Sequence, residues 1–172
     1  MPDGMDEVDV VSGAALMVKR RAFAQVGGFS SAYFMYAEEV DLCHALRHTG
    51  WKIVHCADAE ITHFGGQATK KCEDGFVDTA MRDSVFYFLL QTRGRIYARL
   101  YRLGMLVSAA FRLIALTVIF PFSVTLGRPM KREKFFRSYR KWLRIGKWGL
   151  TAYYSEVTPH KLRASQEKIT SI

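Results

Sequence analysis

The feature that most constrains this chain is an apolar stretch at residues 103–127, LGMLVSAAFRLIALTVIFPFSVTLG. A helix of about 20 mainly apolar residues can cross a bilayer, and the stretch reaches that length. It contains Arg112, however, and a charge near mid-bilayer costs roughly 2.5–3.5 kcal/mol. Pro121 is expected to break or kink the helix, which leaves the uninterrupted run at 113–126 too short to span comfortably. We therefore expect helices that lie in, or dip into, one leaflet.

A densely basic segment with interleaved aromatic residues follows at residues 128–148. Each Lys or Arg near an anionic membrane adds about 1 kcal/mol of attraction, and Trp and Tyr prefer the interface. Arg99, Arg102 and Arg112 are expected to extend to the headgroups. The pattern predicts peripheral or shallow attachment to a membrane surface. A true span and a buried core helix with a solvated basic face are the alternatives.

Charge is divided unevenly along the chain. Residues 1–90 carry 8 Lys/Arg and 13 Asp/Glu, a net charge of −5, and residues 91–172 carry 17 and 3, a net charge of +14. A basic nucleic-acid-binding protein would not usually begin with an acidic half, and such binding would leave the apolar stretch unexplained. We expect no nucleic-acid partner, but an acidic catalytic or binding part followed by a basic part that meets an anionic surface.

The three cysteines, Cys43, Cys56 and Cys72, cannot all pair with each other and form no CxxC motif. Neither a disulfide scaffold nor a cysteine-built zinc site is indicated, so a reducing compartment is the simpler interpretation. The first twenty residues are acidic and lack the basic n-region of a signal peptide. Apolar residues make up 49% of the chain, enough for a core, which excludes general disorder.

The first part of the chain alternates short apolar runs with helical patterns, as in an α/β fold. Glycines punctuate the pattern after residue 26, at Gly50 and at Gly65-Gly66. A long helix follows, with a break near Gly94. The expected strands are 8–19, 51–56 and 60–64, and the expected helices are 20–26, 38–49 and 78–101.

Three carboxylates, Glu38, Glu39 and Asp41, stand at the start of an expected helix, directly after the aromatic loop 29–36. Acidic side chains at a helix N-terminus complement the helix dipole, which accounts for one or two of them. A carboxylate beside apolar rings and like charges holds its proton more tightly, as a general base for a sugar hydroxyl requires. The cluster is therefore a candidate catalytic site. His63, in an expected strand, is either a packed core histidine or a metal ligand.

The order of motifs resembles the C-terminal half of the catalytic domain of family-2 glycosyltransferases with the GT-A (Rossmann-like) fold. The rhamnosyltransferase-like members of bacterial polysaccharide and cell-wall assembly are the most similar. The resemblance covers about residues 8–68, and more weakly 80–125. The motifs are VSGAALMVKRRAFAQVGGF, FMYAEEVDLCHALRHTGWKIV and AEITHFGGQAT.

The resemblance implies a role for each matching residue. Glu39 takes the position of the catalytic base, where the family more often has Asp, and Glu38 is the other member of that acidic pair. Asp41 matches the second acid of the motif and fixes the helix start or the acceptor loop. The remaining matches are donor- or acceptor-binding positions, Gly13, Ala14, Phe34, Tyr36 and Trp51, and His63, which helps to hold the metal or the leaving diphosphate.

The resemblance also implies parts that this sequence lacks. The family binds its nucleotide on an N-terminal half that ends in a DXD motif, and nothing similar precedes Val8. We expect Mg²⁺ or Mn²⁺ in the complete enzyme, and no tight binding by this chain alone. The expected function is an inverting, nucleotide-sugar-dependent glycosyltransferase, here truncated, whose isolated chain is inactive. The alternative is a non-catalytic, membrane-associated remnant or partner-binding module.

The resulting fold expectation is α/β: the C-terminal part of a GT-A mixed sheet, followed by an all-helical membrane-proximal tail. The parts are a catalytic segment at 1–77, a helical membrane-associated region at 78–154 and a polar tail at 155–172. The expected partners are a nucleotide-sugar donor, a lipid-linked glycan acceptor, and a separate N-terminal half or a second copy. The expected location is the cytoplasmic face of the cell membrane.

Overall fold

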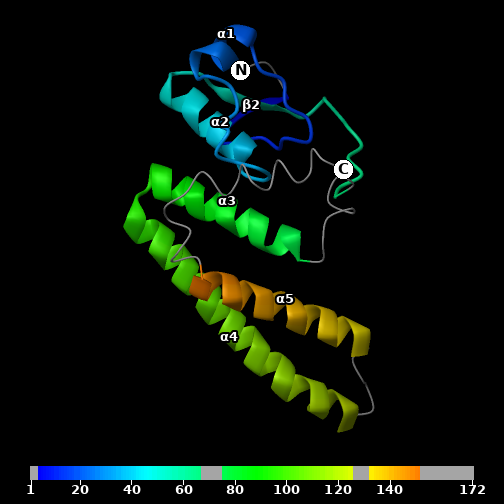
Figure 1. The fold of residues 1–172 in the computed structure, drawn as a ribbon. Helices are drawn as coiled ribbons and strands as arrows, with labels where there is room; N and C mark the ends of the chain where they lie inside the picture. Colours follow the sequence, from blue (N-terminus) through cyan, green and yellow to red (C-terminus); the bar gives the residue numbers. More distant parts are fainter. Residues whose placement is uncertain (1–3, 67–74, 126–131, 152–172) are drawn as a thin grey trace, which may run out of the picture. The chain divides into compact units, whose positions relative to one another are not determined.

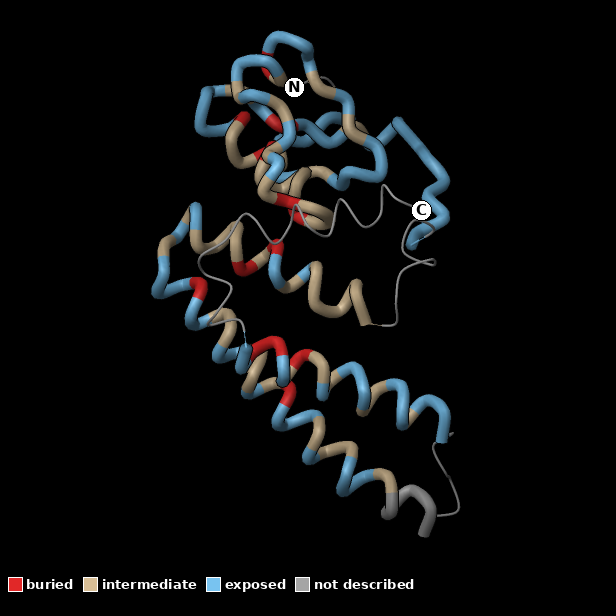
Figure 2. The backbone as a smooth tube through the Cα atoms, viewed as in Figure 1, coloured by how far each residue is buried: buried red, intermediate tan, exposed pale blue. Residues whose placement is uncertain are grey.

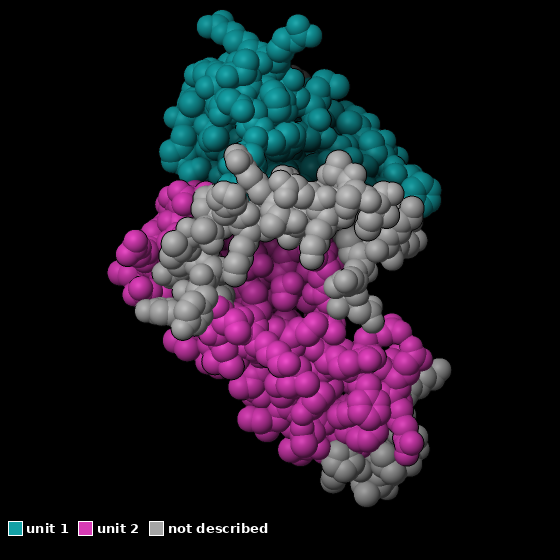
Figure 3. Space-filling view, viewed as in Figure 1, with its two compact units in different colours: residues 1–72, 162–172 teal, residues 73–161 magenta. Residues whose placement is uncertain are grey.

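The computed structural model describes residues 4–66, 75–125 and 132–151 (Figure 1). These residues fall into two compact units. One contains residues 4–66, and the other contains residues 75–125 and 132–151 (Figure 3). The described part is mostly helical, with one small sheet, which agrees with a mixed α/β class in its coarse form. The polar tail expected at 155–172 lies outside the described residues.

The sheet of the first unit has two antiparallel strands, β1 (Met5–Val8) and β2 (Ile53–Cys56). Met5 pairs with Cys56 and Val8 with Ile53. Strand β2 confirms the expected strand at 51–56. Strand β1 lies upstream of the strand expected at 8–19, and that prediction is wrong from residue 9 onward.

The reason for this difference lies at Ser12. The Ser12 hydroxyl accepts a hydrogen bond from the Ala14 amide at 3.2 Å, and the Ser12 carbonyl accepts one from the Ala15 amide at 3.4 Å. Local bonds of this kind satisfy the backbone within the segment, so it turns instead of joining the ladder. The apolar run therefore reaches the core only at separate positions, Val11, Leu16 and Val18.

The expected strand at 60–64 is also wrong, because these residues are irregular and exposed. Within residues 4–66 the strands are β1 and β2, so the expected mixed sheet is not present in this described part. An apolar run adopts a strand when a neighbouring strand pairs with it. Neither β1 nor β2 pairs with residues 60–64 in the described part of the chain.

Two helices cover the core of this unit, α1 (Arg20–Gln25) and α2 (Glu38–His48), and both were expected from the sequence. Helix α1 ends where Gly28, at φ 78°, donates its amide to the Phe23 carbonyl at 2.9 Å. Helix α2 ends at Gly50, at φ 87°. The buried core consists of Ala22, Leu42, Cys43, Leu46 and Ile53.

The second unit contains three helices in its described residues: α3 (Phe76–Thr92), α4 (Arg95–Thr125) and α5 (Arg132–Thr151). The expected break near Gly94 is confirmed, since Gly94 lies between α3 and α4 with φ 86°. Helix α4 does not break at Pro121 but continues to Thr125. A core formed by Phe86, Ala98 and Trp148 joins the three helices.

Helices α4 and α5 form an antiparallel hairpin (Figure 1). Phe120 stacks on Phe135 near the turn, with ring centroids 4.1 Å apart, and Tyr101 meets Trp148 at the other end. The helices approach closely at Gly149, where a Cβ atom would lie 2.5 Å from Leu106 Cδ2. A residue without a side chain is therefore required at that point.

Exposed residues recur along α4 (Figure 2), and on the side away from α5 they are apolar. Seven apolar residues recur there every three or four positions, and each is at least 57% exposed. We call them the apolar face of α4: Ile96, Leu100, Leu103, Val107, Phe111, Ile114 and Val118. By length and composition alone, the segment Arg95–Phe120 could cross a membrane, and only 6% of its most apolar window is buried.

Candidate functional site

The candidate site is the start of α2, where the backbone enters the helix in an unusual conformation. Tyr36 and Ala37 both have positive φ angles, 70° and 63°. Each such non-glycine residue costs about 1 kcal/mol or more, and strained residues of this kind cluster at functional sites. Ala37 is buried, and its carbonyl accepts the Asp41 amide at 2.9 Å, which closes the first helical turn. The backbone conformation at these two residues therefore sets where the helix begins, and with it where the carboxylates of the first turn lie.

Asp41 is held by a tyrosine from the preceding loop. The Tyr33 hydroxyl donates a hydrogen bond to Asp41 Oδ1 at 3.2 Å, and Tyr33 is only 7% exposed. This contact ties the aromatic loop to the first turn of α2. Asp41 therefore anchors the aromatic loop to the start of the helix.

Glu39 lies against the backbone of Gly13. A Cβ atom built on Gly13 would lie 3.5 Å from Glu39 Cβ, 3.6 Å from Cγ and 3.7 Å from Cδ. Distances of this size are ordinary van der Waals contacts, so the Glu39 side chain lies beside the Gly13 backbone. Two residues that the sequence pattern assigns to the site, 26 positions apart, are therefore brought into contact.

Glu38 carries a buried oxygen, Oε2, that has no hydrogen-bond partner among the described residues. A buried carboxylate oxygen left without a partner is expensive, because it has lost its water without gaining a donor. A hydroxyl donor that enters the site would satisfy this oxygen. The positive end of the α2 dipole offsets part of the charge of the carboxylates in the first turn, Glu38, Glu39 and Asp41.

The other expected binding residues divide into two groups. Phe34 and Tyr36, half-buried, lie in the loop that enters α2, and Ala14 is exposed beside Gly13. Trp51 is different, because it follows the C-terminal end of α2. An 11-residue helix separates that end from the carboxylates of the first turn by about 15 Å. Its indole Nε1 donates to Gln25 Oε1 at 3.1 Å, and its side chain packs on the core cluster. The structure therefore does not bring Trp51 to the start of α2.

His63 lies in the exposed, irregular segment after β2. Among the residues that the structure describes, no three His, Cys, Asp or Glu side chains come together as a metal-binding group. A divalent metal needs several such ligands, and His63 alone supplies one. These residues do not fit a metal site by themselves, so we derive no chemical step through a metal.

Sequence reasoning missed two features of the site. Tyr33 was assigned only to an aromatic loop, although its spacing of eight residues before Asp41 is consistent with the observed contact. The buried, unpaired Glu38 Oε2 has no signal in the sequence.

Comparison with known proteins gives partial matches to sugar transferases. Over 59 residues, the chain is 48% identical to N-acetylglucosaminyl-diphospho-decaprenol L-rhamnosyltransferase of Mycobacterium tuberculosis. It is 33% identical over 57 residues to rhamnosyltransferase WbbL of Escherichia coli, and 30% identical over 56 residues to low-salt glycan biosynthesis hexosyltransferase Agl10 of Haloferax volcanii. No protein-family profile and no solved structure matches the chain.

These matches cover a limited part of each protein. Each match covers about a third of this chain: 34% for the M. tuberculosis enzyme and 33% for each of the other two. It covers 19% of the M. tuberculosis enzyme, 22% of WbbL and 18% of Agl10. The matched region thus spans about a fifth of the length of these relatives. All three names describe transfer of a sugar, so the matches support a glycosyltransferase family.

Proposed function

We propose that residues 4–66 form the acceptor side of an inverting, nucleotide-sugar-dependent glycosyltransferase, with Glu39 as its general base. The observation that carries this proposal is that Glu39, in the first turn of α2, lies beside Gly13, where a Cβ atom would be 3.7 Å from Glu39 Cδ. Three relatives whose names state sugar transfer support it.

The proposed chemistry is a direct displacement. The Glu39 carboxylate accepts the proton of the acceptor hydroxyl, whose oxygen attacks the anomeric carbon of the donor sugar. The bond between that carbon and the diphosphate breaks on the opposite face, and the nucleoside diphosphate leaves with the electron pair. The configuration at the anomeric carbon is inverted.

Glu39 is a better base than its neighbours for geometric reasons. Asp41 is occupied by the Tyr33 hydroxyl. Glu38 Oε2 is enclosed and suited to accept a hydrogen bond from a bound hydroxyl. Glu39 alone of the three lies along Gly13, where a sugar ring could approach the carboxylate. We assign Glu38 to orienting the acceptor and Glu39 to removing its proton.

We further propose that the acceptor is a lipid-linked glycan and that the second unit attaches the protein to the cytoplasmic face of the membrane. The M. tuberculosis relative is named for a diphospho-decaprenol substrate. The apolar face of α4 runs from Ile96 to Val118, about 33 Å of helix, and the exposed Arg99 borders it. A soluble core helix would be mostly buried, and this one is mostly exposed.

Shallow attachment accommodates the charges of α4 better than a full span does. The Arg112 guanidinium lies 4.5 Å from the centre of the Trp142 ring of α5, so a cation–π contact within the hairpin shields it. Arg112 stays on the side of α4 that faces α5, while the apolar face enters the leaflet and Arg99, at its border, extends to the headgroups. Membership of family 2 and the GT-A fold belong to this same proposal.

The test is sugar transfer by the native species, captured from its own membranes with an antibody to residues 155–172. Labelled UDP- and dTDP-sugars and extracted isoprenoid lipids serve as substrates. We expect transfer that disappears in Glu39→Gln and persists in Glu60→Gln, an equal change at an exposed residue. Transfer that is absent from the captured wild-type species, with every donor, would favour the non-catalytic alternative.

A further inference from the structure

One side of α5 carries a row of arginines around a hollow. Arg137, Arg140 and Arg144 are spaced three and four residues apart, so they share a side of the helix. Together with Glu133 they line a hollow of about 220 Å³. We call these three residues the arginine face of α5. Arg137 pairs with Glu133 at 2.6 Å, while Arg140 has no partner among the described residues.

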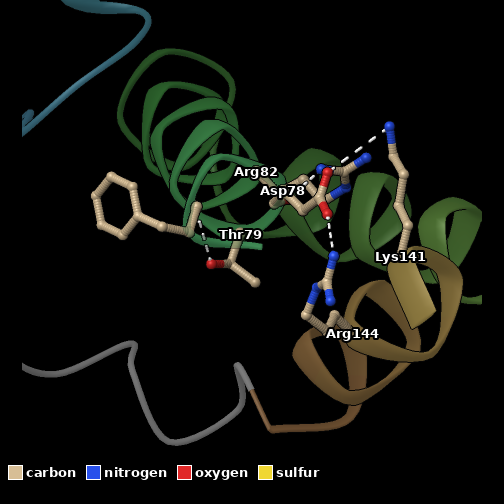
Figure 4. A network of polar contacts seen from close by, with 6 residues as sticks. Asp78, Thr79, Arg82, Lys141 and Arg144 are labelled. Carbon is tan, nitrogen blue, oxygen red and sulfur yellow. Dashed lines mark hydrogen bonds and ion pairs between the residues drawn. The ribbon is translucent and has the colours of Figure 1, made fainter. Parts of the chain in front are cut away.

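Positive charge exceeds negative charge where this face meets α3 (Figure 4). The Asp78 carboxylate receives a hydrogen bond from Arg144 Nη2 at 3.0 Å and lies 3.7 Å from Lys141 Nζ. Arg82 donates to the Asp78 carbonyl. The Asp78 carboxylate therefore pairs with two cations, and the carbonyl of the same residue accepts from a third.

Two guanidinium nitrogens of this cluster are buried and unsatisfied. Arg82 Nε and Arg144 Nε have no hydrogen-bond partner among the residues that the structure describes. A buried N–H donor on a cation that lacks an acceptor carries a desolvation penalty. An anion bound beside Arg144 would supply acceptor oxygens. It would also offset the excess positive charge here, where two carboxylates, Asp78 and Glu133, face five cations: Arg82, Arg137, Arg140, Lys141 and Arg144.

The position of the arginine face argues against the lipid surface as its partner. Trp142, Gly146 and Gly149 of α5 contact α4, and at 100° per residue the arginine face lies on the opposite side of α5. The apolar face of α4 lies on the side of that helix that is opposite α5. The two faces are thus separated by about two helix diameters, roughly 20 Å, which exceeds the Debye length of about 8 Å at physiological salt.

We propose that the arginine face of α5 binds a diphosphate ester. Guanidinium groups match phosphate oxygens with paired hydrogen bonds, and a row of three suits two linked phosphates. The inference rests on the proposed function, in which a diphosphate occurs in two reactants: the nucleoside diphosphate of the donor and the isoprenoid diphosphate of the acceptor. The chemistry that the site recognises is common to both.

Calorimetric titration of the full chain tests this proposal. The probes are inorganic diphosphate, UDP, farnesyl diphosphate and, for comparison, sulfate, at one ionic strength. We expect diphosphates to bind at least about tenfold more tightly than sulfate. Tighter binding of UDP would assign the site to the donor, and tighter binding of farnesyl diphosphate would assign it to the lipid.

The matched variants are Arg137→Gln/Arg140→Gln and Arg132→Gln/Lys134→Gln. Both remove two charges from α5, but the second pair lies off the arginine face. We expect the first double variant to lose about tenfold or more in diphosphate affinity, and the second to stay within about threefold. Equal losses in the two variants, or equal affinity for sulfate and diphosphate, would overturn the proposal. So would a loss of binding to anionic vesicles that equals the loss of diphosphate binding.

This outcome is separable from that of the proposed function. Glu39→Gln is in the other unit and should bind diphosphate as the wild type does. A chain that binds diphosphate through α5 but transfers no sugar refutes the proposed function alone. A chain that transfers sugar but has no diphosphate preference refutes the α5 site alone.

Discussion

The close approach of α4 and α5 at Gly149 predicts a difference between two glycine substitutions in the same helix. A Cβ atom on Gly149 would lie 2.5 Å from Leu106 Cδ2 and 2.6 Å from its Cγ, whereas one on Gly146 would lie 3.9 Å from Ala109 Cβ. Leu106 Cγ is close to the helix backbone and cannot move aside by a simple rotation of a chain end. Gly149→Ala therefore requires repacking, and Gly146→Ala does not.

The magnitude follows from two opposing effects. Alanine is about 1 kcal/mol more favourable than glycine in a helix interior, and both variants gain this amount. Overpacking at residue 149 costs about 1–3 kcal/mol. We expect Gly146→Ala to stabilise the second unit by about 0.5–1 kcal/mol. Gly149→Ala should be about 1–3 kcal/mol less stable than Gly146→Ala, because the helix gain cancels in the comparison.

The assay is urea unfolding followed by tryptophan fluorescence in a Trp51→Phe background. The remaining tryptophans, Trp142 and Trp148, both lie in α5 and report on the second unit. The stability difference is measured between the two alanine variants, so any effect of the background substitution cancels. Equal stability of the variants, within about 0.5 kcal/mol, would refute the close packing of α4 and α5.

Three further predictions concern attachment, pH and the loop. Phe111→Glu, at a residue 72% exposed on the apolar face of α4, should weaken flotation with anionic vesicles at least about tenfold. Leu150→Glu, at a residue 71% exposed on α5, should not, and equal effects would argue against α4 as the attachment surface. Burial raises the pKa of Asp83 above its usual 3.8, so the folded state favours the protonated acid, and stability should fall as pH rises through and above that value. Asp83→Asn should flatten this dependence in unfolding experiments between pH 4 and 7, and an unchanged slope would contradict the assignment. Tyr33→Phe should increase amide exchange in the first turn of α2 by removing the hydrogen bond to Asp41, while unchanged exchange would show that this bond does not hold the loop.

The helices were predictable because their ends are marked locally. Gly28 and Gly50 adopt positive φ angles that other residues avoid, and Gly94 divides α3 from α4 in the same way. The exposed strand β1 was not predicted, because MDEV is short and acidic. Its strand conformation depends on pairing with β2, some 45 residues away, which no local pattern reveals.

The arrangement of the candidate site was not predictable from the sequence. The carboxylates were singled out by their position before α2 and the other residues by resemblance, and the structure places Glu39 beside Gly13 but leaves Trp51 at the other end of α2. The apolar stretch and the basic segment were evident from composition, yet their division into opposite apolar and basic faces was not. That division requires knowing which sides of α4 and α5 pack together, which follows from the glycines at 146 and 149.

The most direct test of the central claim is the turnover rate of Glu39→Gln relative to Glu39→Asp, measured at saturating donor and acceptor. A general base contributes about 10²- to 10⁴-fold, so Glu39→Gln should lose at least about 10²-fold in kcat. Glu39→Asp keeps the carboxylate and should retain a larger share of the rate, with the free energy of unfolding unchanged in both. A Glu39→Gln enzyme within about threefold of the wild-type kcat would contradict the assignment of Glu39 as the base.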